Sequence, residues 1–71
     1  MNDEITPASY RIVDAVTDRI LTGTISEALI RAAAASETET VTAYEVSGVW
    51  HWCSPSNLAS YRARLVRIEA R

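Results

Sequence analysis

Residues 40–53 read TVTAYEVSGVWHWC and carry the strongest strand signal in the chain. Residues that favour strands, β-branched and aromatic, flank the pair Ser47-Gly48. Such a two-residue connection with glycine is typical of a tight hairpin, whose turn requires positive φ angles. The turn also fixes the register of the strands, which pairs Val46 with Val49, Glu45 with Trp50, Tyr44 with His51 and Ala43 with Trp52.

Both faces of this hairpin are largely apolar, because side chains alternate between the two sides of a strand. One face carries Tyr44, Val46, Val49, His51 and Cys53, and the other carries Val41, Ala43, Glu45, Trp50 and Trp52. An apolar face has to be covered. We expect one face to pack on a helix and the Trp50/Trp52 face to bind a second copy or another protein. Two helices of the same chain covering both faces is the alternative.

The segments before the hairpin predict a second hairpin and a helix. Residues 10–22, YRIVDAVTDRILT, are rich in strand-forming residues and favour a hairpin, although Thr6-Pro7 and Gly23 would also suit the ends of a helix. Residues 25–36 consist mainly of strong helix formers. They follow the capping-box pattern Thr24-Ile25-Ser26-Glu27, which makes Thr24 the expected N-cap.

The C-terminal segment is expected to be an amphipathic helix over about residues 56–69. Leu58, Tyr61, Leu65 and Ile68 recur at helical spacing, with the arginines outside this apolar stripe. The end of the segment, residues 65–69, would also suit a last strand. The expected fold class is therefore α+β: a small antiparallel sheet of hairpins, with helices at 25–36 and about 56–69.

Length and composition predict a single small domain. The chain has 71 residues and 48% hydrophobic residues, so we expect a flexible lead-in over residues 1–9 and one domain over residues 10–71. A domain this short buries limited apolar surface, which makes a homodimer plausible. One cysteine excludes an intramolecular disulfide, and no stretch has the length of a membrane span. The expected compartment is the cytoplasm.

Sequence motifs for catalysis and cofactors are absent, so we expect a non-enzymatic protein with no cofactor, no metal and no catalytic residue. His51 and Cys53 share a strand face, but a structural zinc site needs four ligands and the chain has one histidine and one cysteine. Ser54 near His51 lacks the glycine-rich turn of a nucleophile. No phosphate-binding glycine loop is present.

The aromatic residues and the arginines give two alternative binding sites. Tryptophan, tyrosine and arginine dominate the energetics of protein interfaces. The expected protein-binding site consists of Trp50, Trp52, Tyr61 and Glu45. Charge is uneven: residues 46–71 hold four arginines against one acid, although the whole chain has a net charge of −2. The alternative is therefore a nucleic-acid-binding site made of Arg62, Arg64, Arg67 and Arg71.

The order of motifs over residues 10–53 also carries a family resemblance. The pattern Tyr-Arg-Ile-Val-Asp, then Thr-Ile-Ser-Glu-Ala with an alanine-rich helix, then an aromatic hairpin, resembles small uncharacterised accessory proteins of actinobacterial phages and plasmids. The C-terminal arginine-rich segment lies outside it. The resemblance implies a phage accessory protein that acts by binding a host protein, and it carries over no site residues.

Overall fold

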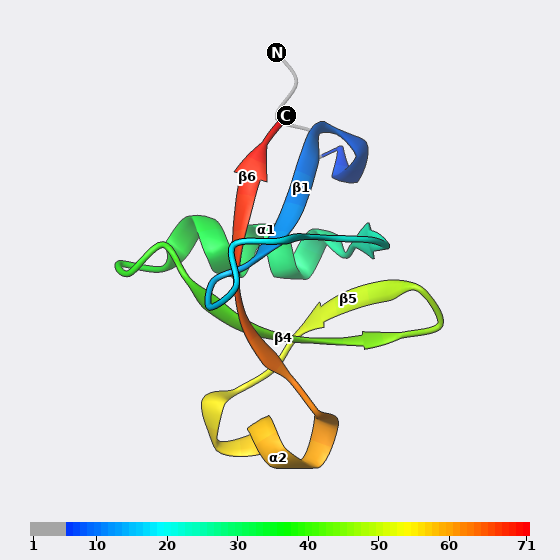
Figure 1. Ribbon diagram of the computed structural model, residues 1–71. Coiled ribbons are helices and arrows are strands. Elements are labelled where there is room, and N and C mark those ends of the chain that lie inside the picture. The colour runs from blue at the N-terminus through cyan, green and yellow to red at the C-terminus, as the bar shows by residue number, and fades with distance from the viewer. Residues whose placement is uncertain (1–5) are drawn as a thin grey trace.

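The described residues form one curled, mixed six-stranded sheet with a single helix of more than two turns. A computed structural model describes residues 6–71, apart from the side chains of Leu58 and Ser60. Figure 1 shows the arrangement of the elements. In chain order they are η1 (Pro7–Ser9), β1 (Tyr10–Asp14), β2 (Ile20–Leu21), β3 (Thr24–Ile25), α1 (Glu27–Ala35), β4 (Val41–Val46), β5 (Val49–Trp52), η2 (Pro55–Asn57), α2 (Leu58–Tyr61) and β6 (Arg64–Ala70).

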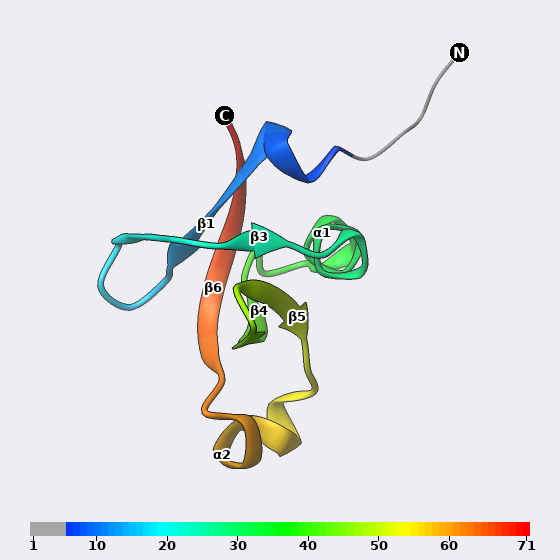
Figure 2. The same ribbon diagram turned by 90° about the vertical axis from the view of Figure 1, so that its right-hand side faces the viewer.

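The strand order explains why the sheet curls. The order is β2-β1-β6-β4-β5-β3, and all neighbours are antiparallel except β3 and β5. The strands at the two ends of this order, β2 and β3, are separated in the chain by only Thr22 and Gly23. The sheet must therefore bend round until its ends meet, and β3 approaches β1 as Figure 2 shows.

Both predicted hairpins are confirmed. The β4–β5 pairs are those that the sequence predicts, from Val46 opposite Val49 to Ala43 opposite Trp52. The turn residues Ser47 and Gly48 have φ angles of 51° and 84°, as a primed turn requires. In the first hairpin, Ile12 pairs with Leu21 and Val13 with Ile20, so the helical alternative for residues 10–22 is wrong.

The helix expected at residues 25–36 is present as α1, but it begins later than predicted. Ser26 is the N-cap, and its hydroxyl accepts a hydrogen bond from the Leu29 N–H at 3.2 Å. The expected cap, Thr24, instead lies in β3 with Ile25, where both residues pair with β5. Tertiary pairing with β5 thus overrides the local capping signal. Leu29 and Ile30 of α1 enter the core.

The helix expected over residues 56–69 is wrong. Only the short elements η2 and α2 are helical, and residues 64–70 form β6, the strand that the sequence offered as an alternative. Arg62 has a φ of 51°, a left-handed conformation that ends α2. β6 then occupies the gap between β1 and β4, where its ladder bonds to both strands stabilise the extended form.

The core lies inside the curl of the sheet, where α1 covers it. Ile12, Leu29 and Val66 are the largest fully buried side chains, and each comes from a different element. The expected lead-in is described only in part, since residues 1–5 lie outside the described residues. Its end, Pro7–Ser9, forms the 3-10 turn η1.

Candidate functional site: an aromatic face and a basic hollow

The expected protein-binding residues do not form one surface, because Trp50 belongs to the core. Its side chain is 7% exposed, and its indole N–H donates to the Thr22 carbonyl at 2.8 Å. Glu45 has a local structural partner, since its carboxylate accepts a hydrogen bond from the Gly48 N–H in the hairpin turn. Trp50 therefore joins the hairpin to the link between β2 and β3, and Glu45 stabilises the hairpin turn.

Trp52 and Tyr61 are both 48% exposed, but they lie on different sides of the hairpin. Trp52 shares a face of β5 with the buried Trp50, at the end of the strand. Tyr61 comes from α2 and stacks on Tyr44 of β4, with a ring-centroid separation of 4.5 Å and an interplanar angle of 20°. Tyr44 belongs to the opposite face of the hairpin. The sheet alternation thus separates two residues that the sequence analysis grouped together.

The uncovered side of the hairpin carries an aromatic face that the sequence analysis did not select as a site. It comprises Tyr44, Val46, Val49, His51 and Tyr61. His51 lies beside Tyr44, with the two ring centroids 5.5 Å apart. Val46 is half-exposed at the tip. The sequence correctly predicted that one hairpin face packs on the core. It assigned the Trp50/Trp52 face to the outside, which is wrong, because both faces are similarly apolar in sequence.

The four C-terminal arginines are also dispersed. On a strand, Arg64 shares a face with Val66, whereas Arg67 points to the other face. Arg62 and Arg71 flank opposite ends of β6. The expected helix would have placed all four outside one apolar stripe, so the change from helix to strand removes the cluster.

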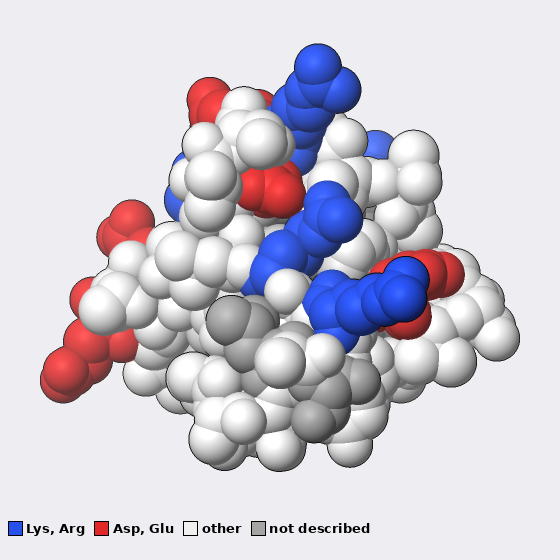
Figure 3. Space-filling model, turned by 60° about the horizontal axis from the view of Figure 1, so that its bottom comes forward, with Lys and Arg blue, Asp and Glu red and all other residues white. Residues whose placement is uncertain are grey.

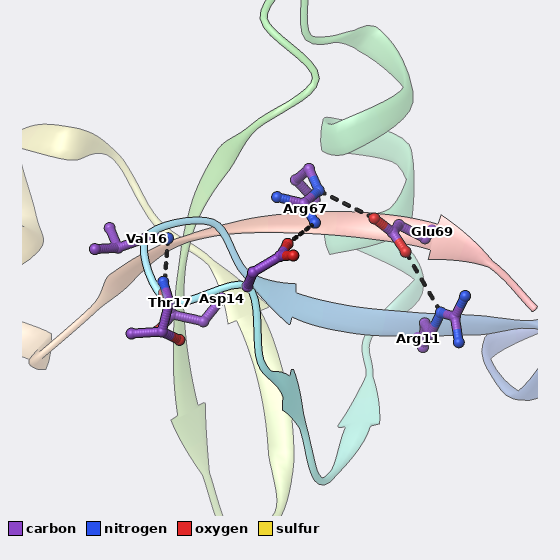
Figure 4. Close-up of polar contacts among 7 residues, drawn as sticks. Arg11, Asp14, Val16, Thr17, Arg67 and Glu69 are labelled. Carbon is purple, nitrogen blue, oxygen red and sulfur yellow. Dashed lines mark hydrogen bonds and ion pairs between the residues drawn. The ribbon is translucent and has the colours of Figure 1, made fainter.

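Arg67 is held in an ion-pair network on the outside of the sheet. Its guanidinium donates to the Asp18 carboxylate and, at 3.0 Å, to that of Glu69. Glu69 also faces the Arg11 guanidinium at 3.4 Å, and Figure 4 shows Arg11, Glu69 and Arg67 in a row across β1 and β6. Hydrogen bonds to Asp18 and Glu69 raise the pKa of Arg67. Arg67 therefore has a structural role in the sheet, because its guanidinium is already bound by two carboxylates.

Two arginines do converge, at a basic hollow of about 730 Å³ between the β1–β2 turn and the start of β6. One side of the hollow is lined by residues 62–65. The rest of its lining consists of Asp14, Val16, Thr17 and Thr42. Val16 is 81% exposed at its rim. Figure 3 shows arginine side chains across the middle of the face that carries α2, with acidic side chains both beside them and at the left edge of the view.

Asp14 organises the wall of this hollow. Its carboxylate accepts hydrogen bonds from the Val16 and Thr17 N–H groups at 2.8 and 3.0 Å, which shape the β1–β2 turn (Figure 4). The Arg64 guanidinium lies 3.4 Å from its other oxygen. The backbone hydrogen bonds from Thr17 and Val16, with the charge of Arg64, lower the pKa of Asp14. Asp14 is therefore ionised and offsets part of the positive charge of the hollow.

A metal-binding cluster is not found in the described part of the chain. No cluster of three or more His, Cys, Asp or Glu side chains that would hold a metal occurs among residues 6–71. Cys53 is buried, and burial raises the pKa of its thiol, which keeps it protonated and unreactive. None of the described helices is long and apolar enough to cross a membrane.

Comparison of the chain with protein-family models, with curated proteins and with solved structures finds no match. The chemistry of the two surfaces therefore carries the functional argument.

Proposed function

We propose that this chain is a small non-catalytic protein-binding domain and that the aromatic face is its binding surface. The observation that carries the proposal is the stacked pair Tyr44–Tyr61, of which Tyr61 is 48% exposed, beside His51 on a sheet face away from the core. The partner class that the sequence resemblance implies is a host protein.

Composition and geometry both favour this surface. None of its five residues is Lys, Arg, Asp or Glu, in a chain with 23% charged residues. Depletion of charge and enrichment of tyrosine mark the centres of protein interfaces. The stack also fixes the Tyr61 ring before any partner arrives. Binding therefore loses less side-chain entropy there than it would with a free tyrosine.

Quantitative capture with matched variants tests the proposal. The tagged chain would be immobilised, exposed to nuclease-treated bacterial lysate, and the retained proteins quantified by mass spectrometry. We expect one protein to be retained by the wild type and reduced about tenfold or more by Tyr61→Ala, because truncating a central tyrosine costs about 2 kcal/mol. Arg31→Ala is the control, since Arg31 lies on α1 and pairs only with Glu27 among the described residues.

Two outcomes would contradict the proposal. One is retention of the same partner by the wild type, Tyr61→Ala and His51→Ala alike. The other is the absence of any protein retained by the wild type in stoichiometric amount. A self-association function would show as a dimer in sedimentation equilibrium that Tyr61→Ala dissociates.

The basic hollow favours nucleic-acid binding as a second candidate function. Arg62 and Arg64 line the same hollow, and guanidinium groups bind phosphate well. Against it, Arg64 faces Asp14 and Arg67 is bound by two carboxylates. Fluorescence anisotropy with a labelled single-stranded oligonucleotide at 50 and 200 mM salt would test it. Binding that weakens with salt and is lost in Arg62→Ala would support it.

A further inference from the structure

The feature that carries a further inference is the side of β6 that faces away from β1. β6 pairs with β1 at residues 66–70, but with β4 only at residues 64–66. β4 begins at Val41, opposite Val66, and the preceding residues turn away from the sheet, with Glu39 at a φ of 63°. Beyond Val66, no described strand therefore lies on this side of β6.

The direction of the ladder hydrogen bonds shows which backbone N–H and C=O groups of β6 have no strand partner. The Arg71 N–H donates to the Ser9 carbonyl and the Ala15 N–H to that of Leu65, both at 2.9 Å. Odd-numbered residues of β6 therefore direct their N–H and C=O groups toward β1, and even-numbered residues direct theirs to the opposite side. Val66 meets Val41 there. The N–H and C=O groups of Ile68 and Ala70 point to the open side and have no hydrogen-bond partner among the described residues.

A hollow of about 390 Å³ lies along this open edge. Its wall on the helix side is small and apolar, formed by Ile30, Ala33 and Ala34 of α1. Tyr10, Ile68, Arg67 and Glu69 form the strand side, and Glu39 stands at the end where β4 begins. Figure 1 shows the upper part of β6 beside the C-terminal end of α1 and the loop that leads to β4.

We propose that this open edge of β6 binds an extended peptide segment of a partner protein by strand addition. The two free donors and two free acceptors, spaced along one strand edge, are complementary to a backbone in extended conformation. A residue paired with Ile68 points, like Ile68 itself, toward the apolar wall of α1, so the peptide carries a small aliphatic side chain there. Glu39 lines the same hollow at the end where β4 begins. Glu37 and Glu39 have no cationic partner among the described residues, so they favour a positive charge.

A second copy of β6 fits this edge less well than a peptide. The antiparallel register that pairs Ile68 with Ala70 of another copy places the two copies of Glu69 directly opposite each other, where like charges destabilise the pair. The register centred on Ile68 would place Ala70 of the other copy beside Val66, and β4 already occupies that position. The edge is thus free for a peptide that enters from the end of β6.

The experiment combines amide hydrogen exchange with titration of a defined peptide, followed by two-dimensional NMR. In the free monomer we expect fast exchange at the Ile68 and Ala70 amides and slow exchange at those of Glu69 and Arg71. The probe is acetyl-Thr-Val-Thr-Val-Arg-amide. At saturation we expect exchange at Ile68 and Ala70 to slow tenfold or more, with that of Glu69 unchanged. A second peptide, which ends in Glu instead of Arg, should have a dissociation constant at least about threefold higher.

Backbone-specific controls make the test strict. N-methylation of both valines removes the two peptide donors, so this peptide should produce no protection. In the protein, Ala70→Pro removes one outward N–H without touching the ladder to β1, a position at which proline is tolerated in edge strands. We expect this variant to bind the probe peptide about threefold or more less tightly than the wild type does. Tyr61→Ala should bind the probe like the wild type, which separates this site from the aromatic face.

Several results would overturn the proposal. Slow exchange of Ile68 and Ala70 in the free monomer would mean that the edge is already paired. Protection that appears only as the protein concentration rises would identify a second copy as the occupant. Equal binding of the N-methylated peptide, or spectral changes confined to other elements at saturation, would exclude strand addition.

Discussion

Replacement of Gly23 by alanine should be among the most damaging single-methyl additions in this chain. Gly23 links β2 to β3 with a φ of 121°, which L side chains rarely adopt. An added Cβ would lie 2.9 Å from the Gly48 carbonyl oxygen and 2.9 Å from the Trp50 indole nitrogen. The backbone strain costs about 1–3 kcal/mol and the overpacking a similar amount, so we expect a loss of about 2–6 kcal/mol.

That loss is large for a domain of this size. At about 0.05–0.15 kcal/mol per residue, the whole chain is stabilised by about 4–11 kcal/mol. Urea unfolding followed by tryptophan fluorescence measures the loss, because Trp50 is buried in the native state. The midpoint of thermal unfolding should also fall by about 10 °C or more.

Gly48→Ala is the matched control for Gly23→Ala. Gly48 also has a positive φ, 84°, but an added Cβ there meets no atom within 4 Å. Only the left-handed backbone is penalised, at about 1–2 kcal/mol. The difference between the variants therefore measures the close approach of the β2–β3 link to the β4–β5 hairpin. Equal losses in the two variants, or a loss below about 1 kcal/mol for Gly23→Ala, would refute this reasoning.

Three further predictions concern the core, the β1–β2 turn and the buried thiol. Leu29→Ala removes a side chain with no exposed surface and should cost about 2–5 kcal/mol in urea unfolding, whereas Ala28→Gly on the exposed side of α1 should cost only about 1 kcal/mol. Because hydrogen bonds from Thr17 and Val16 lower the pKa of Asp14, its ionised form stabilises the fold above about pH 4. That stabilisation is lost as the pH falls through the lowered pKa, so stability measured from pH 6 to 2 should fall less steeply in Asp14→Asn; identical profiles would exclude the role given to Asp14. Cys53, with its burial and raised thiol pKa, should react with a thiol reagent at neutral pH only slowly in buffer and rapidly in urea; rapid reaction of the native protein would show that the β5 end opens easily.

The predictable part of the fold is the part that local chemistry determines. Ser47-Gly48 fixes the register of β4 and β5 without help from the rest of the chain, and all four predicted pairs are present. The C-terminal strand was harder to predict, because the spacing of the apolar residues there also matches a helix. These residues are Leu58, Tyr61, Leu65 and Ile68. Contacts outside the segment determine that it forms a strand, since β6 pairs with both β1 and β4. No local pattern contains that information.

The surfaces were less predictable than the fold for a related reason. Both faces of the β4–β5 hairpin are apolar in sequence, and the packing of α1 against the hairpin determines that Trp50 lies inside. Tyr61 became part of the aromatic face because α2 ends at Arg62 and leaves its ring against Tyr44. The open edge of β6 depends on where β4 begins, a boundary that a single sequence defines poorly.

The central position of β6 has a kinetic consequence. The β1–β2 hairpin and the β4–β5–β3 group share β6 as the strand that joins them, and the residues that pair between β1 and β6 are more than fifty positions apart in the chain. Neither group can complete its ladder until the last strand has been synthesised and has returned to the first. Contacts of such long sequence separation slow folding, so we expect this domain to fold in milliseconds or longer instead of the microseconds of a helical bundle. Until β6 arrives, the apolar strands of both groups are exposed to other chains in the cell.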